Sequence, residues 1–253
     1  MIKAIMNGCN GRMGRFITDI CAKDEGIEIV AGVDLYDGIS NTYPVFTSIA
    51  DCDVEADVII DFSNAAGVAA LVDYAVAKQI PVVLCTTGIS EETMEKVTAA
   101  YEKVAILKSA NMSLGINTLM ELLKKAAVVF AGAGFDVEIV EKHHNQKLDA
   151  PSGTAIALAD AVNEAMDNQY EYIYDRSTRR QKREAKELGI SAVRGGTIVG
   201  EHDVLFCGQD EVITFSHTAY SRAVFAKGAV EAAKFLAGKP AGHYEMADVI
   251  AAK

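Results

Sequence analysis

Two histidines and a lysine that could move protons lie close together in the middle of the chain. His143, His144 and Lys147 fall within five residues, and they bring proton donors and positive charge into an otherwise acidic protein. The sequence Pro151-Ser152-Gly153-Thr154 follows and begins an expected helix, whose first N–H groups can hold a carboxylate. The segment therefore predicts an acid beside an anion receptor. The alternative is a polar loop that is capped by Ser152 or Asp149.

A glycine-rich turn near the N-terminus is the second candidate site. Gly8, Gly11 and Gly14 have the spacing G-x-x-G-x-x-G and stand between an expected strand and an expected helix. Glycines in such a turn let the backbone approach a pyrophosphate and present helix-terminal N–H groups to it. Asp34, twenty residues past Gly14, ends the next strand, where its carboxylate could accept the ribose hydroxyls of a dinucleotide. The alternative is a glycine turn that only packs a helix on a strand.

The elements that carry the glycine turn have the pattern of a parallel α/β domain. Short apolar runs predict strands at residues 2–6, 27–33, 58–60, 82–84 and 104–107, with helical segments at 65–78 and 91–102 between them. Nearly continuous apolar strands that alternate with helices require a parallel sheet covered on both faces. The first part of the chain is therefore expected to form a Rossmann-like dinucleotide-binding domain.

The elements around the histidines follow a different pattern. Apolar stripes predict helices at 114–130 and 152–167, residues 135–141 alternate as a one-sided strand, and residues 204–207 and 211–217 are typical of antiparallel strands joined by a tight loop. A smaller α+β domain with an open mixed sheet is expected at 114–222. A last helix at 223–236 could return to the first domain, which is then expected to comprise 1–113 and 223–253.

Composition narrows the class of protein. The chain has 253 residues, 50% of them hydrophobic, and a net charge of −11, which indicates a globular protein and disfavours binding to nucleic acid or an anionic membrane. Five widely spaced cysteines without a C-x-x-C pair are typical of reduced thiols, and no signal peptide or membrane-spanning stretch is evident. We expect a cytoplasmic location. No metal site is expected, because adjacent histidines on an extended chain point apart.

Several motifs in order resemble one family, the 4-hydroxy-tetrahydrodipicolinate reductases of diaminopimelate and lysine biosynthesis. The segment Glu141–Ala155 closely resembles the family signature, and Gly8–Gly14 resembles its G-x-x-G-R-M-G turn. Further matches are Ile60–Ser63, Thr86–Gly88, Ala110–Ser113 and Arg194–His202. Because the resemblance runs along the whole chain, it is more specific than any one motif.

The resemblance implies an NADH- or NADPH-dependent reduction. Hydride passes to C4 of a cyclic imine dicarboxylate as the hydroxyl leaves as water, with His143 and Lys147 as proton donors. It assigns the substrate carboxylates to His144, Ser152, Gly153 and Thr154. It assigns the cofactor to Gly8, Cys9, Asn10, Gly11, Arg12, Met13, Asp34, Cys85, Thr86, Thr87, Ser109, Ala110, Asn111 and Met112. It also implies a homotetramer built through the sheet of the second domain.

Three features of this chain need their own interpretation. Cys85 stands where the family usually has glycine, and we expect a small buried thiol there rather than a redox switch. Asp34 is followed by Leu35, Tyr36 and Asp37, and the lack of a guanidinium favours NADH over NADPH, unless a lysine such as Lys3 reaches in. The basic stretch from Arg176 to Lys186 is expected to be a solvated loop or short helix near the substrate entrance.

Two other functions are open at this point. A regulator that senses NADH without chemistry would need the glycine turn and Asp34, but no proton donors in the second domain. A two-domain dehydrogenase of another kind, acting on aspartate or on a semialdehyde, is the second rival. The semialdehyde enzyme would need a nucleophilic cysteine, for which Cys207 in an apolar strand is a poor candidate.

Overall fold

The computed structural model describes residues 1–36, 38–109 and 111–252 of the chain. The chain divides into two compact units, and each is described by itself. Unit 1 is formed by Met1–Leu114 together with the C-terminal segment that begins at Ala223, and unit 2 is formed by Gly115–Arg222. Among the described residues, no helix is long and apolar enough to cross a membrane.

Unit 1 is built on a parallel sheet. Its described part has seven strands in the order β12-β6-β5-β4-β1-β2-β3, and each neighbouring pair is parallel. The strands are β1 (Ile2–Asn7), β2 (Ile27–Val33), β3 (Val45–Phe46), β4 (Val58–Asp61), β5 (Val82–Leu84), β6 (Ala105–Leu107) and β12 (Gly242–Tyr244). The strand order reverses between β1 and β4, so the loops after these two strands diverge at the same edge, where α/β proteins bind ligands.

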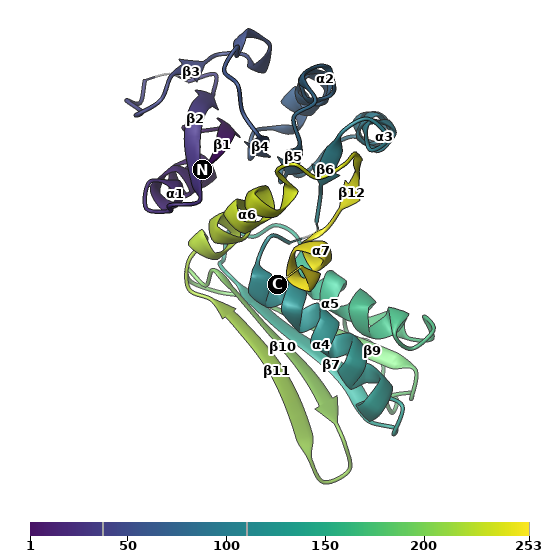
Figure 1. Ribbon diagram of the computed structural model, residues 1–253. Coiled ribbons are helices and arrows are strands. Elements are labelled where there is room, and N and C mark those ends of the chain that lie inside the picture. The colour runs from purple at the N-terminus through teal and green to yellow at the C-terminus, as the bar shows by residue number, and fades with distance from the viewer. Residues whose placement is uncertain (37, 110, 253) are drawn as a thin grey trace. The chain divides into compact units, whose positions relative to one another are not determined.

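Helices cover both faces of this sheet (Figure 1). Helices α1 (Arg12–Cys21), α6 (Ala223–Leu236) and α7 (Met246–Ala251) pack in one core with Ala4 and Met6 of β1. Helix α2 (Val68–Lys78), preceded by the short turns η1 (Ile49–Asp51) and η2 (Ala65–Gly67), packs with α3 (Glu91–Ala100) in another core with Ile5. Alternate residues of one strand enter opposite cores, which explains the continuous apolar runs of the sequence.

Unit 2 has a mixed sheet with helices on one face. The order is β11-β10-β7-β9-β8, with β7, β9 and β8 parallel and β10 antiparallel to both of its neighbours. Helices α4 (Leu114–Phe130) and α5 (Gly153–Glu164) cover one face, as Figure 1 shows. The strands are β7 (Asp136–His143), β8 (Glu171–Ile173), β9 (Glu187–Arg194), β10 (Gly200–Cys207) and β11 (Val212–Ala219).

The expectation for the basic stretch is confirmed only in part. Residues between 174 and 186 form an irregular loop in which Arg180, Lys182 and Lys186 are exposed, but Arg176, Arg179 and Arg183 are held in ion pairs. Arg176 and Arg183 bind Glu138 at 2.8 and 2.9 Å, and Arg183 also binds Asp136. These acids lie at the start of β7, whereas His143 lies at its end. Partners from a distant strand, which a local charge count does not reveal, fix the loop at the far end of the sheet.

Candidate functional site

The glycine turn of unit 1 has no room for side chains at two positions. Gly8 has a φ of 83°, and a Cβ there would lie 2.5 Å from the carbonyl oxygen of Phe62. A Cβ on Gly14 would lie 2.2 Å from the carbonyl oxygen of Gly8. The turn therefore brings bare backbone from β1, β4 and the start of α1 together, a cradle that fits the phosphates of a dinucleotide.

A pocket of about 550 Å³ opens beside this turn. It lies at the carboxyl ends of β1, β2 and β4, and its lining includes Gly8, Gly11, Asp34, Leu35, Ser63 and Asn64. The Asp34 carboxylate accepts the Asn10 N–H at 2.9 Å and the Tyr36 N–H at 3.1 Å, so its position is fixed. The pocket places a carboxylate beside the glycine turn, as the sequence predicted, and it is large enough to admit part of a dinucleotide.

The other residues assigned to the cofactor take varied positions. Cys9 is fully buried in the core of unit 1, where burial raises the pKa of its thiol to about 11, so only its backbone is available to a ligand. Met13 and Met112 also pack in that core, while Arg12 is exposed. Asn111 accepts the Ser113 N–H at 2.7 Å. Ala110 and Asp37 lie outside the described residues.

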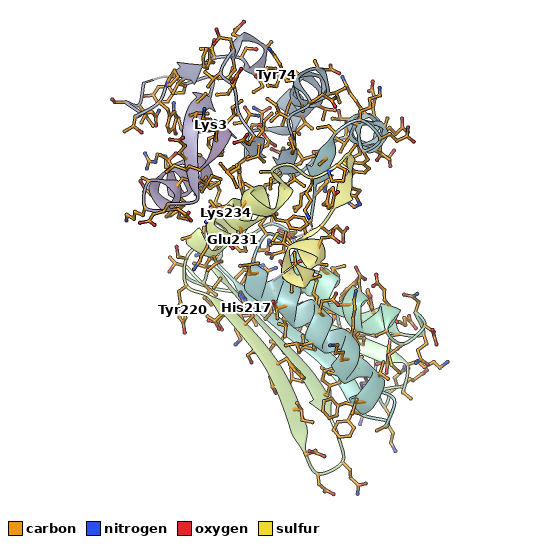
Figure 2. The ribbon with its side chains drawn as sticks, viewed as in Figure 1. Lys3, Tyr74, His217, Tyr220, Glu231 and Lys234 are labelled. Carbon is orange, nitrogen blue, oxygen red and sulfur yellow. The ribbon has the colours of Figure 1, made fainter. Side chains whose placement is uncertain are left out.

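Cys85 and Lys3 answer two questions that the sequence left open. Cys85 is partly buried against the core, and burial raises the pKa of its thiol well above the usual value, so the thiolate needed for redox chemistry is disfavoured. Lys3 is at the opposite edge of the sheet from Asp34. There its backbone N–H donates to Asp57. Lys3 and Tyr74, both labelled in Figure 2, are among the residues that line a separate pocket. Lys3 therefore provides no positive charge beside Asp34.

Asp61 joins the loops around the pocket, a role that the sequence analysis did not assign. It is fully buried at the end of β4 and accepts hydrogen bonds from the side chains of Asn7 at 2.8 Å and Ser63 at 2.7 Å. Its backbone carbonyl accepts the Cys85 N–H. Burial raises the pKa of Asp61, and the hydrogen bonds oppose the increase. The segments after β1, β4 and β5 are thus tied to one residue next to the cradle.

In unit 2, His143 lies at the end of β7 on the face covered by helices. Its Nδ1 is 2.6 Å from Oε2 of Glu141, two residues earlier and therefore on the same face of the strand. Glu141 is fully buried and His143 is nearly so. On the neighbouring strand, a Cβ at Gly200 would lie 3.1 Å from His143 Nε2, so a glycine at this position leaves room for the ring.

Three further elements converge on the same pair. Arg194, at the end of β9, grips both oxygens of Glu141 at 2.8 Å. Ser152, the N-cap of α5, donates its N–H to Glu141 Oε1 at 3.0 Å. The Ser152 hydroxyl accepts the Ala155 N–H at 3.2 Å and lies 3.1 Å from Nε2 of His202 on β10. The start of α5 is therefore fastened to the sheet beside His143.

The charges of this cluster follow from burial and pairing. Burial opposes ionisation of Glu141, but the hydrogen bonds from Arg194 and His143 outweigh it and hold the pKa of Glu141 below its usual value. Burial lowers the pKa of His143, and Glu141 only partly offsets this. Burial and the nearby His143 lower the pKa of His202 to about 4. His217, opposite His202 on β11 and labelled in Figure 2, also has its pKa lowered by burial.

The remaining predicted residues lie on the loop between β7 and α5. Lys147 forms an ion pair with Asp149 at 2.9 Å, which lowers the pKa of Asp149, and its charge acts on His143. His144 is partly exposed, and Gly153 and Thr154 form the first turn of α5. The structure thus gathers the predicted proton donors and the predicted anion receptor in unit 2. The alternative expectation, that Ser152 caps the helix, is also met, because its side chain accepts the Ala155 N–H.

Sequence reasoning missed Glu141, Arg194 and His202 as parts of this site. All three belong to motifs that carried the family resemblance, but their roles depend on strand pairing. Glu141 pairs with His202 across β7 and β10, and His143 pairs with Arg194 across β7 and β9. The signal available in the sequence was the E-x-H spacing, which places a carboxylate on the same strand face as a histidine.

The matching family models and the curated relatives point to one family. The family models described as "Dihydrodipicolinate reductase, N-terminus" and "Dihydrodipicolinate reductase, C-terminus" match residues 2–112 and 115–250. Two relatives named 4-hydroxy-tetrahydrodipicolinate reductase are similar over nearly their whole length. The one from Caldanaerobacter subterraneus is 50% identical over 99% of this chain and 98% of its own. The one from Clostridium tetani is 49% identical over 97% and 96%.

A solved structure of the same kind is also similar. It is a dipicolinate-bound dihydrodipicolinate reductase from Paenisporosarcina sp. TG-14, with a TM-score of 0.80 and 25% sequence identity. The match covers 97% of this chain and 97% of that one. Both units therefore have counterparts in a reductase of known structure.

Proposed function

The chain belongs to the dihydrodipicolinate reductase family, and on this premise we propose how its residues divide the work. It is an oxidoreductase that reduces 4-hydroxy-tetrahydrodipicolinate with NAD(P)H in diaminopimelate and lysine biosynthesis. The substrate is a cyclic imine with two carboxylates. One hydride and one proton are added, and the C4 hydroxyl leaves as water, so the site must bind two negative charges and supply a proton.

His143 is the proposed proton donor, together with Lys147. The observation that carries this proposal is the contact of His143 Nδ1 with the buried Glu141, next to the N-terminus of α5. Reduction of a conjugated imine builds negative charge on the substrate, and an acid within reach lowers the barrier. Substrate carboxylates also favour the protonated form of His143, which is disfavoured by burial in the unliganded protein.

The substrate carboxylates are proposed to bind at the start of α5 and at His144. Ser152, Gly153 and Thr154 form the N-terminal turn of a twelve-residue helix, and the partial positive charge of this end attracts anions. Lys147 adds a full positive charge from the same loop, and it must exchange its partner Asp149 for the substrate. Dipicolinate, which is bound to the Paenisporosarcina reductase, carries two similar carboxylates and is a suitable dead-end ligand.

The cofactor is proposed to bind unit 1, where NAD(P)H supplies the hydride when bound. Backbone of the Gly8–Met13 turn would hold the pyrophosphate, and Asp34 would accept the ribose hydroxyls. The segments Cys85–Thr87 and Ser109–Met112 are proposed to lie near the nicotinamide. This assignment is supported by the side-chain-free cradle at Gly8 and Gly14.

NADH is the proposed preferred cofactor. Leu35 and Tyr36 are exposed beside Asp34, and no lysine or arginine occurs between Asp34 and Ser48 in the sequence. An extra 2′-phosphate would meet the Asp34 carboxylate without a guanidinium to receive it. NADPH would still bind through the parts that the two cofactors share.

A cytoplasmic homotetramer is the proposed state of the enzyme. All five cysteines are free, which suits a reducing compartment. The face of the unit 2 sheet opposite the helices carries exposed apolar side chains, Val193 and Val212, and could pack against a second copy. Light scattering should give the mass of four chains, and a mass of one chain would contradict the proposal.

Loss of NADH absorbance upon addition of freshly generated 4-hydroxy-tetrahydrodipicolinate tests the activity itself. We expect NADH oxidation that depends on this substrate and is inhibited by dipicolinate. A regulator would bind NADH without oxidising it. A semialdehyde dehydrogenase would not act on this substrate. Binding of NADH without its oxidation, or the absence of any reaction with this substrate, would contradict the proposal.

A further inference from the structure

One buried carboxylate, that of Glu141, holds the proposed proton donor and the proposed carboxylate receptor at the same time. Its Oε2 contacts His143 Nδ1 at 2.6 Å and Arg194 Nη1 at 2.8 Å. Its Oε1 accepts the Ser152 N–H at 3.0 Å and Arg194 Nη2 at 2.8 Å. These contacts come from β7, β9 and α5, and Glu141 is fully buried, so the carboxylate cannot move without moving all three elements.

The contact with Nδ1 determines which ring nitrogen can serve the reaction. An ionised carboxylate accepts hydrogen bonds only, so neutral His143 must carry its proton on Nδ1. Its Nε2 is then the nitrogen that takes up and releases the transferred proton. Without the carboxylate, either nitrogen could carry the single proton of the neutral ring. A ring protonated only on Nε2 has no vacant site there for the next proton.

Arg194 keeps this carboxylate ionised without fixing the charge of the histidine. Its guanidinium binds Glu141 with two parallel hydrogen bonds, which balances a negative charge that burial would otherwise disfavour. An unbalanced buried carboxylate would hold His143 permanently as the cation and make it a poor acid. The other groups that act on the cluster are Lys147 from the loop and His202 from β10.

We propose that Glu141 is a positioning residue for the reductase reaction. It holds His143 with Nε2 available for proton transfer, and through Ser152 it sets the start of α5 at a fixed place relative to that nitrogen. The proposal rests on the role of His143 given above. It adds that one side chain aligns the acid and the substrate carboxylate, and a displacement of about 1 Å between such groups can cost on the order of 10²-fold in rate.

The substitution Glu141→Gln tests the proposal, because glutamine keeps the size of the side chain and removes its charge. Glu138→Gln is a matched control. Glu138 lies on the same strand and is gripped by Arg176 at 2.8 and 2.9 Å, as Glu141 is by Arg194, but it lies on the opposite face from His143. A loss that reflects only a broken carboxylate–arginine pair in the sheet should be similar in the two variants.

For Glu141→Gln we expect kcat to fall at least about 10-fold, which is less than the roughly 10²- to 10⁴-fold that a general acid contributes, because the acid is misplaced rather than removed. The KM for NADH should stay within about 2-fold, because the cofactor contacts belong to unit 1. The alkaline limb of the kcat profile, where the acid loses its proton, should move to lower pH, since the carboxylate no longer stabilises the imidazolium. Glu138→Gln should keep the kcat and the pH profile of the parent.

Nitrogen NMR of protein labelled at histidine reports directly which ring nitrogen carries the proton. The chain has only five histidines to assign. In the unaltered protein, neutral His143 should carry its proton on Nδ1, and in Glu141→Gln part of the population should carry it on Nε2. The proposal is overturned if the unaltered protein has the Nε2–H form. It is also overturned if Glu141→Gln loses rate with no change in the pH limb.

The variant His143→Gln distinguishes a failure of the donor role of His143 from a failure of the positioning role of Glu141. If His143→Gln turns over normally, the role of His143 as donor is wrong, and Glu141 has nothing to position. If His143→Gln is slow while Glu141→Gln matches the parent, only the positioning role is wrong.

Discussion

At the scale of single residues, the proposed chemistry depends on a few side chains whose environments differ from their neighbours'. His143 and His144 are adjacent in the sequence, yet one is buried against a carboxylate and the other is partly exposed. The sequence identified both histidines and Lys147, because their types and spacing are local. It could not identify Arg194 as the partner of Glu141, since that contact spans 53 residues and depends on strand register.

Cofactor choice is a prediction at this scale. We expect kcat/KM to be about 10-fold higher with NADH than with NADPH, which corresponds to about 1.4 kcal/mol. Leu35 is 81% exposed and lines the pocket beside Asp34, so an arginine there could receive a 2′-phosphate. Leu35→Arg should therefore recover part of the NADPH activity, as measured by steady-state kinetics with both cofactors.

Leu35→Gln is the control for this substitution, because it adds a polar side chain without charge. It should leave the preference unchanged. Equal or better use of NADPH by the unaltered protein would contradict the prediction and point to a positive group that contacts the phosphate from another part of the chain.

At the scale of elements, the proposed substrate site depends on the start of α5. It is fixed by the hydrogen bond from the Ser152 N–H to the Glu141 carboxylate of β7 and by the contact of the Ser152 hydroxyl with His202 of β10. The helix itself was predicted from its apolar stripe, and the core strands of unit 1 were predicted from their short apolar runs. Strand β3 has only two residues and β12 (Gly242–Tyr244) has no run of apolar residues, so neither shows the pattern that revealed the equally short β5 and β6. The start of β9 was hidden because it follows directly after a charged stretch.

The burial of His202 predicts an acid sensitivity of unit 2. The pKa of His202 is about 4 in the folded protein against an ordinary 6.5, so between these values the unfolded chain binds more protons. The free energy of unfolding should therefore fall as the pH falls from 6.5 to 4, by about 3 kcal/mol for this residue. In the protonated ring both nitrogens carry hydrogen, so Nε2 can then only donate to the Ser152 hydroxyl.

Urea unfolding at several pH values checks this prediction with His202→Gln, whose uncharged side-chain amide can still form a hydrogen bond with the Ser152 hydroxyl. The variant should lose less stability on acidification than the parent. His243→Gln is the control, because it removes a half-exposed histidine from β12. It should lose as much stability on acidification as the parent. If His202→Gln has the same pH dependence as the parent, His202 is not the cause.

At the scale of the whole molecule, the proposal separates the two tasks between two units. The proposed cofactor residues lie in unit 1 and the proposed proton donors in unit 2. The chain passes from one unit to the other near Leu114 and Arg222. The change in hydrophobic pattern near residue 114 and the final helix at 223–236 revealed this division in the sequence. The ion pairs that fix the loop at 174–186 were not predictable, because their partners lie on β7.

The measurement that tests the account most directly compares turnover with NADH affinity in His143→Gln and Lys147→Ala. Both side chains supply protons in the proposed mechanism and neither is in unit 1, so kcat should fall about 10²-fold or more while the Kd for NADH stays within about 2-fold. Lys142→Ala is the control, since Lys142 points to the other face of β7 and pairs with Glu201 at 3.1 Å. Near-normal kcat in both variants would contradict the account.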